Sequence, residues 1–372
     1  MKKVIIKDGN SQVRQFVAAV LTLFLTVSAF GNDGAYSTRG GVIYPTKESK
    51  ISLDREVLSF RVQDKICNVD ILFEFNNPDD VDRKLLVGFE APAATGDFSP
   101  EIFNTNQIFD FKIMSDGQVL PYIIKATEYR NRELKEPKDL RFSQENPGIF
   151  VFLFDFTFKP GKNQINHSYS FPASTNVAFN QIYNYILTTG SGWAGGTIKN
   201  LTVQFDLGKN KYFYVNDIFE KNADWSIIGS GKVTDEKLSD IWASWANKSS
   251  RMIRILSGKL QIDVKDFKPM ENIEFGIICE DFFYHPIDFD EKHKRLGCFE
   301  LYDNDNYSKE DLKIVRNTIY AQKGYVFKNQ ELRDYFSQFE WYMPDPNLTM
   351  EQIELTEREK ILVNKIIERE KK

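Results

Sequence analysis

Residues 149–158 read IFVFLFDFTF, and this stretch decides the fold class. Phenylalanine occupies every second position from Phe150 to Phe158. Successive side chains of a β-strand point to opposite faces, so these rings share one face of a single strand. The other face begins with Val151 and Leu153 and becomes polar further along. The stretch therefore predicts a strand with one apolar face, whose first half is buried on both sides.

Similar alternation recurs on both sides of this strand, with polar turn sequences between the runs. The further runs are LTVQFDL at 201–207, RMIRIL at 251–256 and KLQIDV at 259–264, and the turn sequences include NNPDD at 76–80 and KPGKN at 159–163. Many short strands without helical patterns between them favour an antiparallel, sandwich-like fold. We expect a mainly β region over residues 32–285, of one or two domains, with 216–247 as a candidate internal boundary.

The N-terminus predicts export. Basic residues precede an uncharged apolar run from Phe16 to Phe30, and the small residues Ala29 and Gly31 lie at its end. The run is shorter than the roughly 20 residues that a membrane-spanning helix needs. We therefore predict a cleaved secretory signal peptide over residues 1–31 and a periplasmic or extracellular location. The alternative is an uncleaved anchor, which is the only membrane attachment we expect.

Charge and cysteine content restrict the partners and cofactors. The chain has 53 acidic and 48 basic residues, a balance that disfavours nucleic-acid binding. Cys67 lies on the same predicted strand face as the apolar residues Val69 and Ile71, so we predict a buried thiol there. The two remaining cysteines, Cys279 and Cys298, are a possible disulfide. No two cysteines or histidines have zinc-ligand spacing, so no metal site is predicted.

No catalytic or cofactor motif is recognisable. GSGWAGG at 190–196 matches G-x-G-x-x-G, but a strand pattern follows it instead of the helix that a dinucleotide site needs. We interpret it as a glycine-rich turn and expect no cofactor. His167 is predicted on an exposed strand face, and none of the three histidines belongs to a known catalytic motif.

The C-terminal residues predict about three helices. Ser308 with Asp311 and Thr356 with Glu359 form capping boxes or similar starts, and Asn329 is a third N-cap. Gly324 follows the first apolar stripe as a C-terminal glycine. The sequence therefore predicts a linker over residues 286–307 and a small all-α domain over residues 308–372.

This C-terminal part resembles a YARHG domain, a helical module of exported proteins. The stretch that carries the resemblance is LKIVRNTIYAQKGYVFKNQELRDYFSQFEWYMP, residues 312–344, and it covers about residues 309–368. The naming motif is altered to YAQKG, because Gln322 and Lys323 replace its arginine and histidine. A fixed ammonium thus replaces an imidazole that titrates near neutral pH, so no pH switch is expected at that position.

The β region is similar to a family of secreted bacterial proteins of unknown function. The similar stretches are GNDGAY at 31–36, YILTTGSGWAG with IKNLTVQF at 185–205, and DFKPMENIEFGI at 266–277. This resemblance implies a secreted β-rich domain and no defined activity.

Four residues of the first predicted helix are candidates for ligand binding: Arg316, Asn317, Tyr320 and Lys323. Positions 316, 320 and 323 share one helix face, and arginine with tyrosine suits carboxylates, sugars or peptides. The competing interpretation gives these positions to the helical core and its cap.

Three functions are consistent with the sequence. We favour a non-enzymatic envelope protein that binds peptidoglycan, another glycan or a protein. The first alternative is a carbohydrate-active or cell-wall hydrolase with a carboxylate pair in the β region. The second is an adhesion or structural subunit that assembles through β edges.

Overall fold

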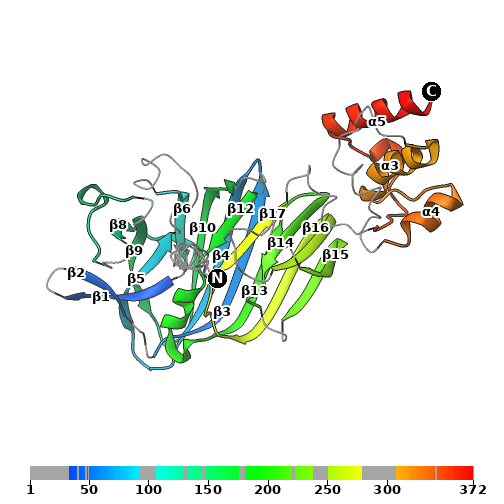
Figure 1. The fold of residues 1–372 in the computed structure, drawn as a ribbon. Helices are drawn as coiled ribbons and strands as arrows, with labels where there is room; N and C mark the ends of the chain where they lie inside the picture. The colour runs from blue at the N-terminus through cyan, green and yellow to red at the C-terminus, as the bar shows by residue number, and fades with distance from the viewer. Residues whose placement is uncertain are drawn as a thin grey trace, which may run out of the picture.

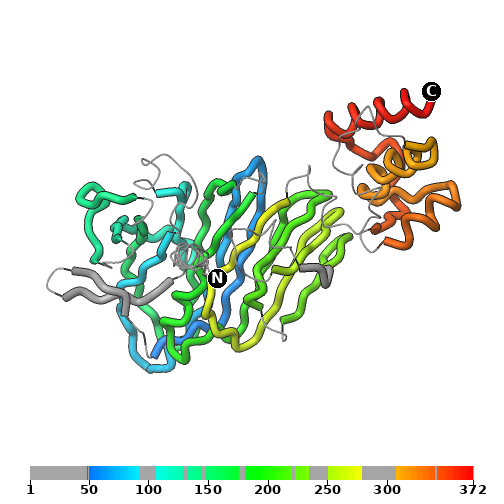
Figure 2. Tube along the Cα trace, viewed as in Figure 1, coloured from blue at the N-terminus to red at the C-terminus, as the bar shows by residue number. Residues whose placement is uncertain are grey.

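The structure is a computed structural model, and its backbone trace is drawn in Figure 2. It describes these residues: 33–39, 42–46, 48, 50–91, 106–128, 133–143, 148–175, 181–219, 223–237, 250–278, 307–339 and 342–371. The predicted signal peptide, the Cys279–Cys298 pair and nearly all of the predicted linker lie outside the described residues.

The phenylalanine-rich stretch forms strand β9, Gly148–Phe158, near one edge of a five-stranded antiparallel sheet. The strand order is β2 (Val42–Thr46), β1 (Asp33–Arg39), β5 (Arg83–Ala91), β9 and β8 (Ile123–Glu128). Phe152 and Phe154 enter the main core, while Val151 and Leu153 pack with Leu134 on the opposite face. The predicted burial of both faces over the first half of this strand is confirmed.

The remaining strands form a twelve-stranded sheet (Figure 1). Along its main path the order is β11 (Ser174–Thr175), β12 (Gln181–Tyr185), β17 (Ile273–Ile277), β14 (Lys211–Asn216), β16 (Ser250–Phe267), β13 (Ile198–Asp206), β3 (Ser52–Gln63), β4 (Ile66–Asn77), β10 (Gly161–Pro172), β6 (Phe109–Ser115) and β7 (Gln118–Val119). Strand β15 (Asp224–Lys237) pairs with β16, and the pairing of β13 with β3 is parallel. The mainly β prediction is confirmed, with one parallel pair in a sheet expected to be antiparallel.

Strand β16 merges two runs that look separate in the sequence. Its 18 residues include both predicted strands, joined through Ser257 and Gly258. Gly258 has φ +91°, and a Cβ on it would lie 2.0 Å from the carbonyl oxygen of Ile228 on β15. Only glycine permits this conformation together with so close an approach. Strand β15 lies within the candidate boundary region 216–247 and pairs with β16.

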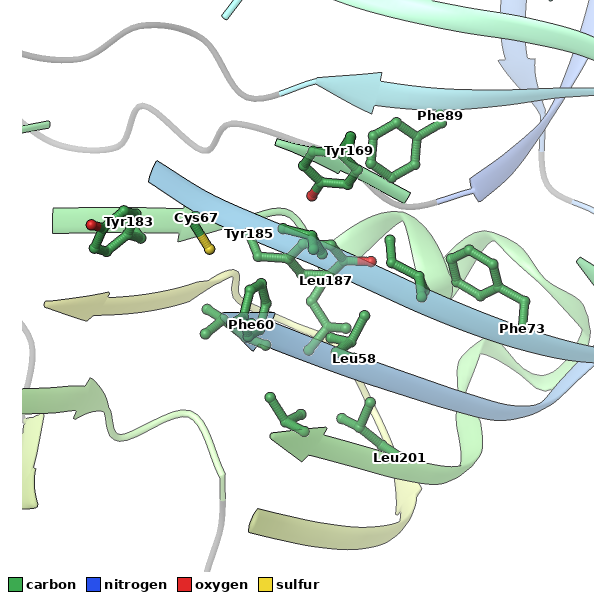
Figure 3. Close-up of a cluster of buried hydrophobic side chains, with 14 of the residues drawn as sticks. Leu58, Phe60, Cys67, Phe73, Phe89, Tyr169, Tyr183, Tyr185, Leu187 and Leu201 are labelled. Atoms are coloured by element: carbon green, nitrogen blue, oxygen red, sulfur yellow. The ribbon is translucent and has the colours of Figure 1, made fainter. Parts of the chain in front are cut away.

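The long sheet turns back over itself. Strands β13 and β14 pair with successive parts of β16, and β14 then leads to β17 and β12. The ring of Phe60 on β3 lies 4.9 Å from that of Phe275 on β17 and 5.6 Å from that of Tyr185 on β12. Figure 3 shows Phe60 and Tyr185 within one buried cluster that also contains Cys67. The predicted buried thiol is confirmed, and burial raises its pKa.

The prediction for His167 is wrong. Its side chain on β10 is only 2% exposed and faces the core between the two sheets. The rings of Phe73 and Phe89 lie 5.3 Å away and that of Phe111 lies 5.4 Å away. In the register of β10 His167 shares the inward phase with Ile165 and Tyr169, so the polar partners occupy the outer face instead.

The C-terminal helices are α3 (Lys309–Gln322), α4 (Gln330–Phe336) and α5 (Glu357–Glu370). Ser308 and Thr356 form the predicted capping boxes, and the side chain of Asn329 accepts a bond from the backbone of Leu332. Short 3₁₀ turns lie at Pro137–Asp139, Thr188–Gly192, Ala194–Gly196 and Met350–Gln352. In Figure 1 the helices lie at one end of the molecule and the five-stranded sheet lies at the other.

Candidate functional site

Three of the predicted ligand-binding residues lie on α3, and Lys323 is the C-cap residue directly after it. Arg316 and Lys323 form ion pairs with residues of α5. The Nε and Nη2 atoms of Arg316 lie 3.2 and 3.1 Å from Oε1 of Glu370, to which both donate. Asn317 donates from Nδ2 to the carbonyl oxygen of Lys313, 2.7 Å away. Arg316 and Asn317 therefore make contacts within the helical module.

Lys323 makes a buried ion pair at the joint between α3 and α5. Its Nζ lies 2.9 Å from Oε1 of Glu359, and the two side chains are 10% and 8% exposed. The other carboxylate oxygen of Glu359 accepts the backbone N–H of Thr356 at 2.8 Å, which completes the capping box. Removing one partner of a buried pair leaves an uncompensated charge, at a cost of about 3–5 kcal/mol. The position thus has a structural role, and ligand binding there remains a prediction.

The apolar faces of the helices pack in two directions. They form two apolar clusters, and the half-buried side chain of Tyr320 contacts both. The first cluster joins α3 to α5 through Leu312, Val315, Ile319, Leu362, Val363 and Ile366. The second, which we call the docking interface, joins Ile314, Ala321, Phe327, Leu332, Phe336 and Tyr342 to Tyr212, Tyr214, Met252 and Ile278 of the sheet. The helices therefore bury part of their apolar surface against the sheet as well as on one another.

Arg254 on β16 connects the sheet to the C-terminal end of α3. The side chain is 1% exposed, and its guanidinium carbon lies 4.5 Å from the ring centroid of Tyr212. Its Nη2 donates to the carbonyl oxygen of Gln322 and to the side chain of Asn210, and its Nη1 donates to the carbonyl oxygen of Ile255 at 3.1 Å. A cation is stabilising at a helix C-terminus, where carbonyl groups lack partners within the helix.

Gly324 permits the close approach at the same joint. Its φ is +88°, and a Cβ there would lie 2.9 Å from the carbonyl oxygen of Met343 and 3.0 Å from Cδ1 of Leu256. The carbonyl oxygen of Gly324 accepts the N–H of Asp345 at 2.8 Å. The predicted C-terminal glycine thus also sets the distance between the helices and β16.

A shallow depression of about 260 Å³ lies on the outer face of the central strands. Two rows of side chains cross strands β3, β4, β10 and β6 there, because the register aligns them. The first row is Val57, Leu72, Asn166 and Met114. The second row is Ser59, Asp70, Ser168 and Lys112. We call these eight side chains the outer-face site.

The same rows continue over β13 and β16 as a hydrogen-bonded network. Gln204, beside Ser59 in the register, donates from Nε2 to Oε1 of Gln261 at 2.8 Å. Thr202 donates to Asp263 at 2.6 Å. These polar groups satisfy one another, whereas Ser168 and Lys112 have no side-chain hydrogen bond or ion pair within the described part of the chain. The open hydrogen-bonding capacity therefore lies at the β10–β6 end of the rows.

The ionisable side chains of Glu56 and His167 are buried. Glu56 is fully buried and accepts a hydrogen bond from the hydroxyl of Tyr185 at 3.1 Å. Burial lowers the pKa of His167 to about 3, so it is neutral at pH 7.

In the described segments no three His, Cys, Asp or Glu side chains gather as a metal site requires. None of the described helices has the length and apolarity needed to cross a membrane.

The comparison with protein families supports the helical assignment. Residues 293–371 match the YARHG domain. The YARHG resemblance is thus confirmed, over a segment that includes α3, α4 and α5. The two residues that depart from the naming motif of this YARHG domain both make contacts between elements. The carbonyl oxygen of Gln322 accepts a hydrogen bond from Arg254 of the sheet, and Lys323 forms an ion pair with Glu359 of α5.

Solved structures give weaker likenesses to the YARHG-containing chain. A "putative nutrient binding protein" from Legionella pneumophila is 15% identical, with a TM-score of 0.48 and with 93% of this chain and 99% of that one covered. A variant M1 zinc metallopeptidase from Deinococcus radiodurans is 8% identical, with a TM-score of 0.23 and coverage of 59% and 43%. Leukotriene A4 hydrolase from Saccharomyces cerevisiae is 8% identical, with a TM-score of 0.27 and coverage of 73% and 36%.

All three TM-scores lie below 0.5, so these likenesses establish no function for this chain. Among curated proteins, no sequence matches it.

Sequence reasoning missed the outer-face site and Arg254. The members of each row come from four different strands, and only the strand register brings them side by side. Arg254 lies in a run that alternates as a strand should, and nothing in that run shows that a helix end will cover its polar face.

Proposed function

We propose that this protein is an exported, non-enzymatic binding protein of the cell envelope, periplasmic or extracellular, and that its sheet carries the binding surface. The outer-face site carries the proposal. It is open to solvent and combines hydroxyl, amide and charged groups with an apolar floor. Binding sites characteristically combine apolar surface with a few convergent polar groups.

The YARHG domain supports the export part of the proposal, because this domain is typical of exported proteins. Its own candidate residues favour a structural role. A ligand at Arg316 or Lys323 would have to compete with the carboxylates of Glu370 and Glu359. We therefore place the binding surface on the sheet and give the YARHG domain the role of a docked module.

The chemistry of the outer-face site supports binding over hydrolysis. Asp70 is the one carboxylate among the residues that line the depression, and its Oδ2 accepts from Arg61 at 2.5 Å. Glycoside hydrolysis commonly needs two carboxyl groups on either side of the scissile bond. His167 contributes to the lining but its ring is enclosed in the core, where it is neutral at pH 7.

Co-sedimentation of the purified full chain with peptidoglycan sacculi tests this function. We expect the protein to pellet with the sacculi and to release no labelled fragments from them. The triple variant Lys112→Ala, Asn166→Ala and Ser168→Ala should remain in the supernatant. A matched control is Lys84→Ala with Asp155→Ala, an exposed pair on the five-stranded sheet with side chains 69% and 66% exposed.

Three outcomes would change the proposal. If the wild-type protein stays in the supernatant, peptidoglycan is excluded as its ligand. If the triple variant pellets as the wild type does, the outer-face site is not the binding surface. If labelled fragments appear and the triple variant abolishes their release, the outer-face site is catalytic and the hydrolase alternative replaces the proposed function.

A further inference from the structure

We propose that the outer-face site recognises the acetamido group of N-acetylated amino sugars in a linear glycan. The inference rests on the proposed binding function and specifies the ligand class of that same site. It is carried by the composition of the depression, by the direction of its two rows and by the position of its one unpaired cation.

The depression is amphipathic on the scale of one small substituent. Val57 and Leu72 are adjacent in the register and half-buried, and Met114 ends the same row at 37% exposed. Asn166 lies between Leu72 and Met114, and Ser168 lies two residues further along the same strand. An acetamido group presents a methyl to apolar surface, and its amide N–H and carbonyl can pair with amide and hydroxyl side chains. A plain sugar hydroxyl offers no methyl for this floor.

The rows run across the strands and favour an extended polymer. Neighbouring strands are about 4.8 Å apart, so a row that crosses six strands extends roughly 20 Å along the sheet surface. The second row continues from Lys112 to Gln204 on β13 and Gln261 on β16. The network there fixes the orientation of its amides before a ligand arrives, which reduces the entropy lost on binding.

The charges at the site favour an anion at one end. Lys112 is exposed on β6 and has no ionic partner within the described segments. Asp70, which Ser168 separates from Lys112 in the same row, already forms an ion pair with Arg61 at 2.5 Å. A carboxylate on the glycan next to the acetamido group would therefore meet Lys112, which is an attraction that salt weakens. The ligand class is thus an N-acetylated, carboxylate-bearing glycan.

Calorimetric titration of the purified full chain with two uncharged probes tests the acetamido group directly. The N-acetylglucosamine tetramer carries the group, and cellotetraose has the same linkage with hydroxyls instead. We expect the acetylated tetramer to bind at least tenfold more tightly. Asn166→Ala with Ser168→Ala should weaken its binding at least tenfold, because the variant loses two hydrogen bonds to the acetamido group. The Lys84→Ala, Asp155→Ala control should bind as the wild type does.

Lys112→Ala separates the two parts of the inference. It should reduce pelleting with sacculi, most clearly at low salt, by a larger factor than it reduces binding of the neutral tetramer. Equal affinity for both tetramers, or unaltered binding by the Asn166→Ala, Ser168→Ala variant, would overturn the acetamido assignment. If sacculi still retain the wild type in that case, the proposed function stands and only the ligand class is wrong.

Discussion

His167 is the residue whose burial has the clearest consequence for pH. Its pKa falls to about 3 in the folded chain because aromatic rings surround it, whereas an unfolded histidine has a pKa near 6.5. Between these values the unfolded state binds a proton that the folded state does not. Stability is therefore lost as the pH falls below about 6.5, by about 2 kcal/mol between pH 7 and pH 5.

The variant His167→Leu should remove this part of the acid sensitivity. Urea unfolding at pH 7 and pH 5 would measure it, and the loss of unfolding free energy should be about 2 kcal/mol smaller in the variant. Ser168→Ala is the control, because it changes the next residue on the same strand without removing a titrating group. Identical pH dependence in His167→Leu and the wild type would mean that His167 takes up its proton while still folded.

At this scale, local chemistry was predictable and burial was not. The capping boxes at Ser308 and Thr356 depend on residues three positions away, so the sequence alone specifies them. His167 and Arg254 are polar residues within strands, and their burial depends on sheets and helices distant in sequence. The period-two alternation in fact places His167 in phase with Ile165 and Tyr169, and the prediction was wrong because it assigned a polar side chain to solvent against that alternation.

At the scale of elements, Gly324 links the end of α3 to strand β16. Gly324→Ala should destabilise the protein by at least about 1–2 kcal/mol, since a side chain is unfavourable at φ +88°. The added methyl group would also crowd Met343 and Leu256. Thermal or urea unfolding would show the loss.

Gly117→Ala is the matched control for this substitution. Gly117 has φ +75° and nothing within 4 Å of an added Cβ, so it should show the conformational cost alone. The excess loss in Gly324→Ala then measures the close contact at the joint. Equal losses in the two variants would mean that the helices move away from β16 without cost.

Individual elements were predicted well, but their alignment was not. The strands around Phe154, Val203 and Ile262 follow from period-two alternation. The sequence did not reveal that 251–256 and 259–264 form one strand, because Ser257 and Gly258 resemble a turn until β15 pairs beside them. The outer-face site depends on the same kind of information, since a shift of one residue in register would send its members into the core.

At the scale of the whole molecule, the sheet and the YARHG domain share apolar surface. Tyr212, Tyr214 and Met252 on the outer face of β14 and β16 are buried by the helices. Tyr214 also covers Gly276, where a Cβ would lie 2.4 Å from its ring. One apolar stripe packs between α3 and α5, and a second packs against the sheet. The helices and the sheet therefore stabilise each other.

Mutual stabilisation predicts that a charge in the docking interface will loosen both partners. Met252 is 1% exposed, so Met252→Asp would place an unpaired carboxylate in apolar surroundings. Met270, which is 68% exposed, provides the control Met270→Asp with the same chemical change. Hydrogen–deuterium exchange should show faster exchange in α3, α4 and β14 of Met252→Asp and wild-type rates in Met270→Asp. If only β14 and β16 lose protection while α3 and α4 keep theirs, the helices are stable without the sheet, and the docking interface positions the YARHG domain without helping it to fold.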